Sequence, residues 1–412
     1  MADVFLFQIR GRPVFSLGKL YRTGLLSLFF AFMLFGNFSR LIPISLFPSS
    51  ISLLEVALYG WALPVYFLKP RKSHLVVLVA VLSTIYGALI NEFDLTSSLY
   101  ALKLIGMIGA GTIVGESFAD EDRLSEYLLR VFSWVLGVGF LIFFVFPKAG
   151  LFFLFLDSLG IHFHGDPHMR RFISPFFDPN YYGAIACIPL ILAWQNRRYG
   201  LVALVLLSII LTFSRSGIAT CGCVVLLLLL FGRGRFSWWA FGGLAILLLP
   251  LIFSQELWHL IERTVYMGED PSALARLGTF EAAFSIFGEH PFFGTGYHYL
   301  SREFEMLTGR LSPDSSVLIT LVDFGLIPTL GILIAGVWWS LSHVRRQGVI
   351  FLFHIYVAIC ILLTSLFNNL LYYPYWLMPV IAMLTRMGGE RDATSSTCPR
   401  LADPDGGRRE GS

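Results

Sequence analysis

The sequence predicts an all-α integral membrane protein, and three observations support this prediction. Of the 412 residues, 56% are hydrophobic and only 14% are charged, whereas soluble domains carry about 25% charged residues. The mean hydropathy is +0.71. Apolar stretches near the length that crosses a bilayer, about 20 residues, recur along most of the chain. A water-soluble protein could not bury so much apolar surface, but lipid can cover it.

About twelve apolar stretches are candidate transmembrane helices, and together they form a polytopic domain over residues 23–386. The two stretches on either side of Ser214 could instead form one long kinked helix, which would lower the count by one. No internal repeat stands out, which disfavours transporter folds built from repeated halves. The candidate spans are 23–39, 50–68, 73–91, 97–115, 128–146, 181–194, 200–212, 217–231, 237–253, 315–341, 349–367 and 370–386.

The distribution of Lys and Arg predicts that both termini are cytoplasmic. Cytoplasmic loops collect basic residues, and with segment 1–22 placed inside, every short inside connection is basic. The carboxyl-terminal tail, 387–412, is also inside, and its Gly, Asp, Arg, Ser and Thr content predicts disorder. The inside basic residues are Arg10, Arg12, Lys19, Arg22, Lys69, Arg71, Lys72, Arg123, Arg130, Arg197, Arg198, Arg233, Arg235, Arg345 and Arg346.

Two outer connections are long, residues 147–180 and residues 254–314. In the larger one, an Asp-Pro pair at 270–271 is a typical helix start, and Gly288 can end the helix. We expect this helix to lie on the bilayer surface or on the bundle through one apolar face. A shorter helix is expected around 257–261. The apolar face would consist of Leu277, Phe280, Phe284 and Phe287.

Arginines in the outer connections are candidate phosphate ligands. Arg215 lies between two serines where two apolar spans meet, Arg276 lies early in the expected loop helix, and Arg170 and Arg171 lie in the other long loop. Arg binds phosphate bidentately and keeps its charge. The alternative is that these side chains only extend from helix ends toward the interface.

Lys103 is a further candidate, because a charge at membrane depth is costly and suggests a function. It lies in the outer half of the span 97–115, and Glu55 lies at a similar depth in another span. A purely structural Lys–Glu pair is the alternative.

Three polar residues at the outer ends of spans have both a structural and a functional interpretation. Asp178 and Asn180 belong to an Asp-Pro-Asn turn that starts a helix, or they contact a sugar or phosphate. Asp314 precedes a span, as a helix N-cap or as a base at the mouth of the bundle.

No metal site is expected. One loop has a cluster with the composition of a metal site, but its Gly and Pro and the lack of a second ligand group favour a solvated loop. That cluster is His162, His164, Asp166 and His168.

Four segments together resemble the bacterial O-antigen ligase and Wzy-type polysaccharide polymerase superfamily. They match the Arg…Pro-Asn segment, the Ser-Arg-(Gly/Ser)-Gly motif, the Arg…Pro-x-x-Gly-x-Gly stretch and the His-Asn-x-x-Leu…Glu-x-Gly helix of that family. Here they read Arg-Phe…Phe-Asp-Pro-Asn at 171–180, Thr-Phe-Ser-Arg-Ser-Gly at 212–217, Arg-Leu…His-Pro-Phe-Phe-Gly-Thr-Gly at 276–296 and Pro-Asp-Ser-Ser…Asp-Phe-Gly at 313–325.

The resemblance implies a bacterial inner-membrane glycosyltransferase with a large periplasmic helical loop. Its substrate would be a glycan on undecaprenyl pyrophosphate, its acceptor a glycan or lipid, and a chain-length regulator protein a candidate partner; no nucleic acid is expected. Arg215 and Arg276 would stabilise the leaving pyrophosphate, with Arg171 helping to hold a phosphate or sugar. Arginines in this role replace a metal, so no cofactor is expected.

One departure favours a polymerase over a ligase. Ligases of this family usually have His where this chain has Asp314, which is then a candidate for orienting or deprotonating the acceptor hydroxyl. Ligation to lipid A-core remains the alternative within the family. A flippase of lipid-linked sugars is the alternative from another class, but it should carry charges along a path open to both sides, and here the unusual cations lie on the outer side. A membrane scaffold would leave Arg215 and Arg276 unexplained.

Overall fold

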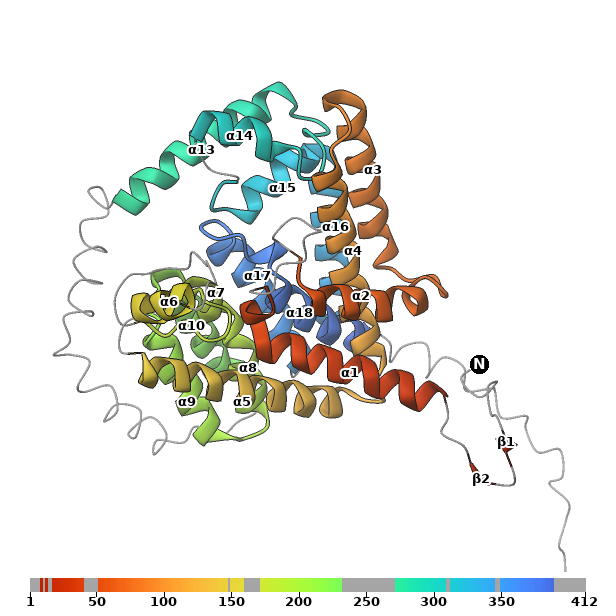
Figure 1. Cartoon of the computed structure of the whole chain (residues 1–412), viewed down its shortest axis with the longest axis vertical. Helices are drawn as coiled ribbons and strands as arrows, with labels where there is room; N and C mark the ends of the chain where they lie inside the picture. Colours follow the sequence, from red (N-terminus) through yellow and green to blue (C-terminus); the bar gives the residue numbers. More distant parts are fainter. Residues whose placement is uncertain are drawn as a thin grey trace, which may run out of the picture.

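The structure, a computed structural model, is almost entirely helical (Figure 1). It describes residues 8–9, 12–13, 17–40, 51–146, 149–158, 171–231, 271–308, 312–344 and 349–388. Near the amino terminus, the strands β1 (Gln8–Ile9) and β2 (Arg12–Pro13) form one short antiparallel pair. The rest of the described chain is built from helices and their connections.

The helices up to the second long outer connection are α1 (Leu17–Phe35), η1 (Gly36–Arg40), α2 (Leu53–Tyr66), α3 (His74–Asn91), α4 (Leu95–Glu116), α5 (Glu121–Val145), α6 (Ala149–Ser158), α7 (Pro179–Ile185), α8 (Cys187–Gln195), α9 (Tyr199–Ile210) and α10 (Arg215–Phe231). Those that follow are α13 (Pro271–Glu289), α14 (Leu300–Thr308), α15 (Ser316–Phe324), α16 (Leu326–Val344), α17 (Val349–Ile359), the π-helical turn η3 (Cys360–Thr364), η4 (Leu370–Tyr372) and α18 (Pro374–Gly388).

Four helical segments among the described residues have the length and hydropathy of a membrane span: Gly18–Arg40, His74–Asn91, Leu95–Glu116 and Glu121–Val145. Shorter apolar helices are Leu53–Tyr66, Tyr199–Ile210, Arg215–Phe231, Leu326–Gly336 and Phe351–Thr364. The protein is therefore an all-α membrane protein, as predicted. The predicted count of about twelve spans is not confirmed, and the span predicted at 237–253 lies outside the described residues.

Two predicted spans are broken helices rather than continuous ones. The stretch 181–194 is divided between α7 and α8, which meet at Ala186. The stretch 315–341 is divided between α15 and α16 at Gly325. Apolar composition alone does not reveal such breaks, because a buried break keeps the same apolar neighbours.

Helix α4 lies at the centre of the core, between α2 and α18. Its small residues allow the close approach of α18: a side chain at Gly111 would meet the Met378 carbonyl oxygen at 2.8 Å, and one at Gly115 would clash with the backbone of Ala382. Membrane helices commonly pack through such small residues, since these let the backbones approach.

Helix α13 forms where the Asp-Pro pattern predicts it, and its predicted apolar face packs on protein only in part. Ala283 and Ile286 are fully buried against α14 and α15. Of the predicted apolar face, Phe280 and Phe287 pack against the same cluster, whereas Leu277 and Phe284 are more than half exposed. Figure 1 shows α13, α14 and α15 together at one end of the molecule, beside α3. The shorter helix predicted around 257–261 lies outside the described residues.

Candidate functional site

The Arg171 side chain joins two segments that the sequence analysis considered separately. Its Nε donates to the Thr212 carbonyl oxygen at 2.7 Å, and its Nη2 donates to Asn180 Oδ1 at 3.3 Å. The neighbouring backbone is also joined, since the Phe172 amide donates to the Leu211 carbonyl at 2.9 Å. Arg171 is only 9% exposed. The guanidinium thus fixes the start of α7 beside the turn that precedes α10.

Asp178 is the N-cap of α7, which confirms its structural interpretation. Its carboxylate accepts from the Asn180 amide at 2.7 Å and from the Tyr181 amide at 3.2 Å, and Pro179 occupies the first helical position. These bonds satisfy amides that have no partner within the helix. The preceding residue, Phe177, has φ +59°, a strained value for a side chain of its size.

Arg215 is the first residue of α10 and is half-buried. The turn before it is held by serine side chains, because Ser214 Oγ accepts from the Gly217 amide at 3.2 Å and lies 3.3 Å from Ser216 Oγ. Phe213 in this turn has φ +47°. Strained backbone next to an arginine at a helix N-terminus is typical of a site whose geometry has a function.

An Asn pair after η3 connects this turn to the segment that contains Asp314. Asn368 Nδ2 donates to Ser216 Oγ at 3.1 Å, and the Asn368 carbonyl accepts from the Ser316 amide at 3.2 Å. Asn369 Nδ2 donates to Ser312 Oγ at 3.3 Å. Asp314 lies between these two serines in the chain, so tertiary contacts bring it to the same side of the bundle as Arg215.

The position of Asp314 corrects one sequence interpretation. Asp314 is not the N-cap of α15; that residue is Ser315, whose Oγ accepts from the Leu318 amide at 3.3 Å. Asp314 and Asp178 both lie close enough to the buried Tyr181 hydroxyl to interact with it electrostatically. Asp314 and Asp178 therefore lie near the same tyrosine.

Lys103 and Glu55 form the predicted ion pair, and a third residue, Arg40, also pairs with Glu55. Lys103 Nζ lies 3.4 Å from Glu55 Oε1, and Arg40 Nη2 lies 3.1 Å from the same oxygen. Glu55 is fully buried and also forms a capping box with Ser52 at the start of α2. Its two oxygens are thus shared by two cations and a backbone amide. The sequence analysis did not include Arg40.

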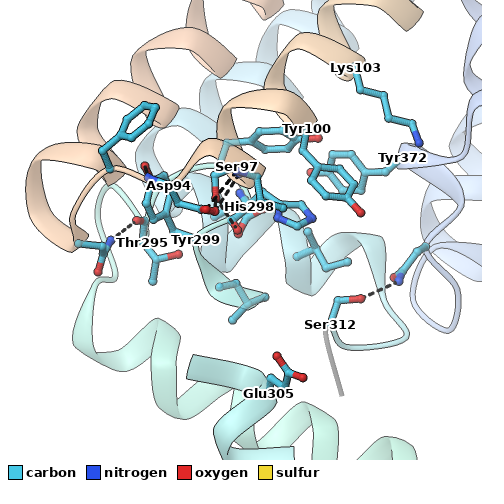
Figure 2. Close-up of a pocket in the computed structure, with 18 of the residues that line it drawn as sticks. Asp94, Ser97, Tyr100, Lys103, Thr295, His298, Tyr299, Glu305, Ser312 and Tyr372 are labelled. Carbon is cyan, nitrogen blue, oxygen red and sulfur yellow. Dashed lines mark hydrogen bonds between the residues drawn. The ribbon is translucent and has the colours of Figure 1, made fainter. Parts of the chain in front are cut away.

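A cavity of about 930 Å³ lies beside this ion-pair network. Its walls come from the α3–α4 connection, the first turns of α4, the loop between α13 and α14, α14 itself, the segment before α15, and η4. Figure 2 shows Tyr100 and Lys103 on one side of the cavity and Glu305 on the other. Ser312 and Asn369, which are hydrogen-bonded to each other, are part of its wall, and the neighbouring Asn368 bonds Ser216 in the Arg215 turn. The sequence analysis named Lys103 as a candidate functional residue, but it did not predict the cavity.

The Gly-Thr-Gly stretch in the cavity wall has a structural role. The Thr295 amide donates to the Val322 carbonyl at 2.8 Å, and the Gly296 amide donates to the Asp323 carbonyl at 3.0 Å. Gly296 has φ +98° and lies against Gly87 of α3 so closely that a side chain would clash. The stretch therefore docks the loop between α3 and the end of α15, as a turn rather than as a phosphate loop.

Three features singled out in the sequence are not part of the cluster as described. Arg276 lies in the second turn of α13, half-buried, and its Nε has no hydrogen-bond partner among the described residues. Arg170 and the cluster at 162–168 lie outside the described residues. Within the described part of the chain, no group of three or more His, Cys, Asp or Glu side chains could hold a metal ion.

The sequence analysis missed Tyr100, His298 and the Asn368–Asn369 pair. The two asparagines were a usable signal, because adjacent amides between two apolar stretches are costly to place there without a role. Tyr100 and His298 gave no signal, since only the fold brings their rings together, 3.6 Å apart and stacked.

Comparison with known families gives one match. A family model described as O-antigen ligase matches residues 200–330, and no curated protein matches the chain. The matched segment runs from α9 to the start of α16 and contains Arg215, Arg276 and Asp314. Together with the apolar helices, the match supports a multi-pass membrane protein of the O-antigen ligase/polymerase type. The match over residues 200–330 thus supports the resemblance of this chain to the O-antigen ligase/polymerase superfamily.

Proposed function

We propose that the protein is a polysaccharide polymerase that joins undecaprenyl-pyrophosphate-linked repeat units at the periplasmic face of the bacterial inner membrane. The observation that supports this best is the hydrogen-bond network through Asn368 and Asn369. It joins the turn that carries Arg215 to the segment that carries Asp314. A cation for a leaving phosphate and a carboxylate for an attacking hydroxyl are the two groups that this reaction needs.

In the proposed reaction, an acceptor hydroxyl attacks the anomeric carbon of the donor glycan with inversion. A new carbon–oxygen bond forms, and the bond from that carbon to the pyrophosphate oxygen breaks. The electron pair leaves with undecaprenyl pyrophosphate, and the hydroxyl proton goes to the Asp314 carboxylate. Arg215 stabilises the charge that builds on the leaving group, and fixed cations in a partly dry site do this well. No metal or cofactor takes part.

Arg171, Asp178, Asn180 and Arg276 have supporting roles in this proposal. Arg171 uses its guanidinium to hold Thr212 and Asn180, so we assign it to positioning the Arg215 turn beside the donor. Asp178 fixes the start of α7, and Asn180 faces the same region. Arg276 has an unpartnered buried Nε among the described residues, which suits a second phosphate contact delivered by the large periplasmic loop, residues 254–314.

A reconstituted assay tests the function. Full-length protein in liposomes receives undecaprenyl-pyrophosphate-linked repeat units from the source organism, and products are resolved by gel and mass spectrometry. We expect a ladder of polymers, reduced about 100- to 1,000-fold by Arg215→Ala and strongly by Arg276→Ala and Asp314→Asn. Arg130→Ala is the matched control, because Arg130 is an exposed arginine paired with Glu126. It should leave the ladder intact.

Other outcomes reassign the protein. Transfer of a single glycan to an added lipid A-core acceptor, without a ladder, would make it a ligase. Binding of the donor without any product would support a flippase. If Arg215→Ala and Arg276→Ala both kept normal polymer formation at equal protein levels, the proposed mechanism would be wrong.

A further inference from the structure

We infer that the 930 Å³ cavity between α4, α14 and η4 binds the acceptor glycan through its hydroxyl groups, and that the donor pyrophosphate binds outside it. The inference rests on the proposed function and assigns one substrate to one part of the site. The cavity volume falls within the range of ligand pockets, about 300–1,000 Å³. Three properties of the wall support the assignment.

The first property is charge. Three carboxylates, Glu92, Asp94 and Glu305, line the cavity, against one lysine, Lys103. Lys103 is itself paired with Glu55 at 3.4 Å. A pyrophosphate entering this space would meet a net excess of negative charge, and like charges at short range repel each other. An uncharged, hydroxyl-rich group meets no such barrier.

The second property is an excess of hydrogen-bond acceptors. Asp323 is 1% exposed, and its Oδ1 has no hydrogen-bond partner among the described residues, while its Oδ2 accepts from the His298 amide at 3.0 Å. Asn369 Oδ1 is likewise buried without a partner in the described part of the chain. Buried acceptors without donors are costly. Sugar hydroxyls can donate to such oxygens, whereas the oxygens of an ionised pyrophosphate cannot.

The third property is the combination of aromatic rings and small polar groups. Tyr100, Tyr297 and Tyr372 line the cavity together with Ser97, Thr96 and Ser312. Rings offer flat apolar faces to the C–H faces of a sugar, and a few polar groups then fix its orientation. A lipid tail, by contrast, would leave the polar groups unpaired.

The location agrees with this role. Ser312 and Asn369 belong both to the cavity wall and to the network that leads to the Arg215 turn. Asp314, the proposed base, lies two residues after Ser312. A glycan in the cavity therefore extends toward the carboxylate that accepts its proton, while the donor pyrophosphate approaches from the side of Arg215.

Binding measurements on the full-length protein in detergent test the inference. The probes are the free oligosaccharide released by mild acid from the source organism's lipid-linked intermediates and, separately, inorganic pyrophosphate. Thr96→Trp fills the cavity from the α4 side, and Glu305→Gln removes an exposed wall carboxylate. We expect Thr96→Trp to weaken oligosaccharide binding at least tenfold, Glu305→Gln to weaken it severalfold, and neither to weaken pyrophosphate binding.

Matched variants control for folding and for the type of substitution. Leu102→Trp adds the same side chain at an exposed position of α4 outside the cavity, and Glu281→Gln neutralises an exposed carboxylate on α13. Both should bind the oligosaccharide as the wild type does. Arg215→Ala should show the opposite selectivity, with weaker pyrophosphate binding and unchanged oligosaccharide binding.

The outcomes separate this inference from the proposed function. Unchanged oligosaccharide binding in Thr96→Trp, or pyrophosphate binding weakened by Thr96→Trp but not by Arg215→Ala, would overturn the acceptor assignment even if a polymer ladder forms. Selective loss of oligosaccharide binding without any transfer to a donor would support the cavity as a glycan site and reject the polymerase.

Discussion

At the scale of single residues, buried charge is the most sensitive feature of the molecule. Glu55 is fully buried between Arg40 and Lys103. Taking ions out of water is expensive, and the cost is recovered only while each charge keeps its partners. Removing the carboxylate would leave two buried cations facing each other.

We therefore expect Glu55→Gln to destabilise the protein by about 3–5 kcal/mol, as measured by thermal unfolding of the detergent-solubilised protein. The matched control is Glu116→Gln, because Glu116 pairs with Arg71 at 2.7 Å but is 40% exposed. Because the Glu116 carboxylate keeps contact with water, its neutralisation should cost much less than that of the fully buried Glu55. Equal shifts in the two variants would contradict the importance of burial.

His298 makes the docked loop sensitive to acid. It lies between α13 and α14, outside the membrane-spanning segments, and burial lowers the pKa of its imidazole from 6.5 to about 4. Asp94 favours the charged ring and Lys103 disfavours it. Above pH 6.5 the ring is neutral whether the loop is docked or not. Between pH 6.5 and 4 only the undocked ring takes up a proton, so docking weakens as the pH falls.

The expected loss of loop-docking free energy reaches about 3 kcal/mol near pH 4. It is measured as the difference in unfolding temperature between wild type and His298→Gln across pH 7 to 4.5. Asp94 must be accounted for, because burial raises its pKa but hydrogen bonds from Ser97 and Thr96 leave it below its usual value. Asp94 is present in both proteins, so the difference isolates His298. A pH-independent difference would reject this origin of the acid sensitivity.

At the scale of elements, the docked Gly-Thr-Gly stretch connects the periplasmic helices to the bundle. Gly296 combines φ +98° with direct contact to Gly87 of α3. The positive φ disfavours any residue with a side chain, and Gly87 leaves no room for one. A side chain here would therefore cause both backbone strain and steric overlap with α3. The cavity wall formed by 295–300 depends on this contact.

Gly296→Ala should therefore destabilise the docked loop by about 1–3 kcal/mol and expose its backbone amides to faster hydrogen exchange. Gly278→Ala is the control, because nothing lies within 4 Å of a side chain there and it is in the middle of α13. That change should be neutral or stabilising. If both variants gave the same exchange rates, the docking role of Gly296 would be wrong.

The sequence predicted that α13 is a helix, but it did not predict which side chains of α13 are buried. The Asp-Pro start and the helical spacing of apolar residues predicted a helix, and one is present. The spacing could not distinguish Leu277 and Phe284, which are exposed, from Ala283 and Ile286, which are buried. Near a membrane, apolar side chains can face lipid as well as protein, so hydrophobicity no longer indicates the inner face.

At the scale of the whole molecule, the orientation in the membrane stays a prediction from the positive-inside rule. Labelling of single cysteines in a cysteine-free background tests it, with a membrane-impermeant maleimide on intact spheroplasts. Glu305→Cys in α14 should be labelled in intact spheroplasts. Lys72→Cys, in the predicted inside connection before α3, should be labelled only after permeabilisation. The reverse pattern would place the cavity on the cytoplasmic side and exclude the proposed reaction.

The sequence by itself determined the membrane class, most helix positions, the helix start at Asp178, the Lys103–Glu55 pair and the family resemblance. These features depend on local composition or on spacing within one segment. Only the tertiary structure decided that Arg171 supports Asn180 and Thr212, that Asn368 and Asn369 join Arg215 to the Asp314 segment, and that a cavity with excess carboxylates lies beside them. Such contacts join residues far apart in the chain, and no local pattern encodes which segments become neighbours when the helices pack.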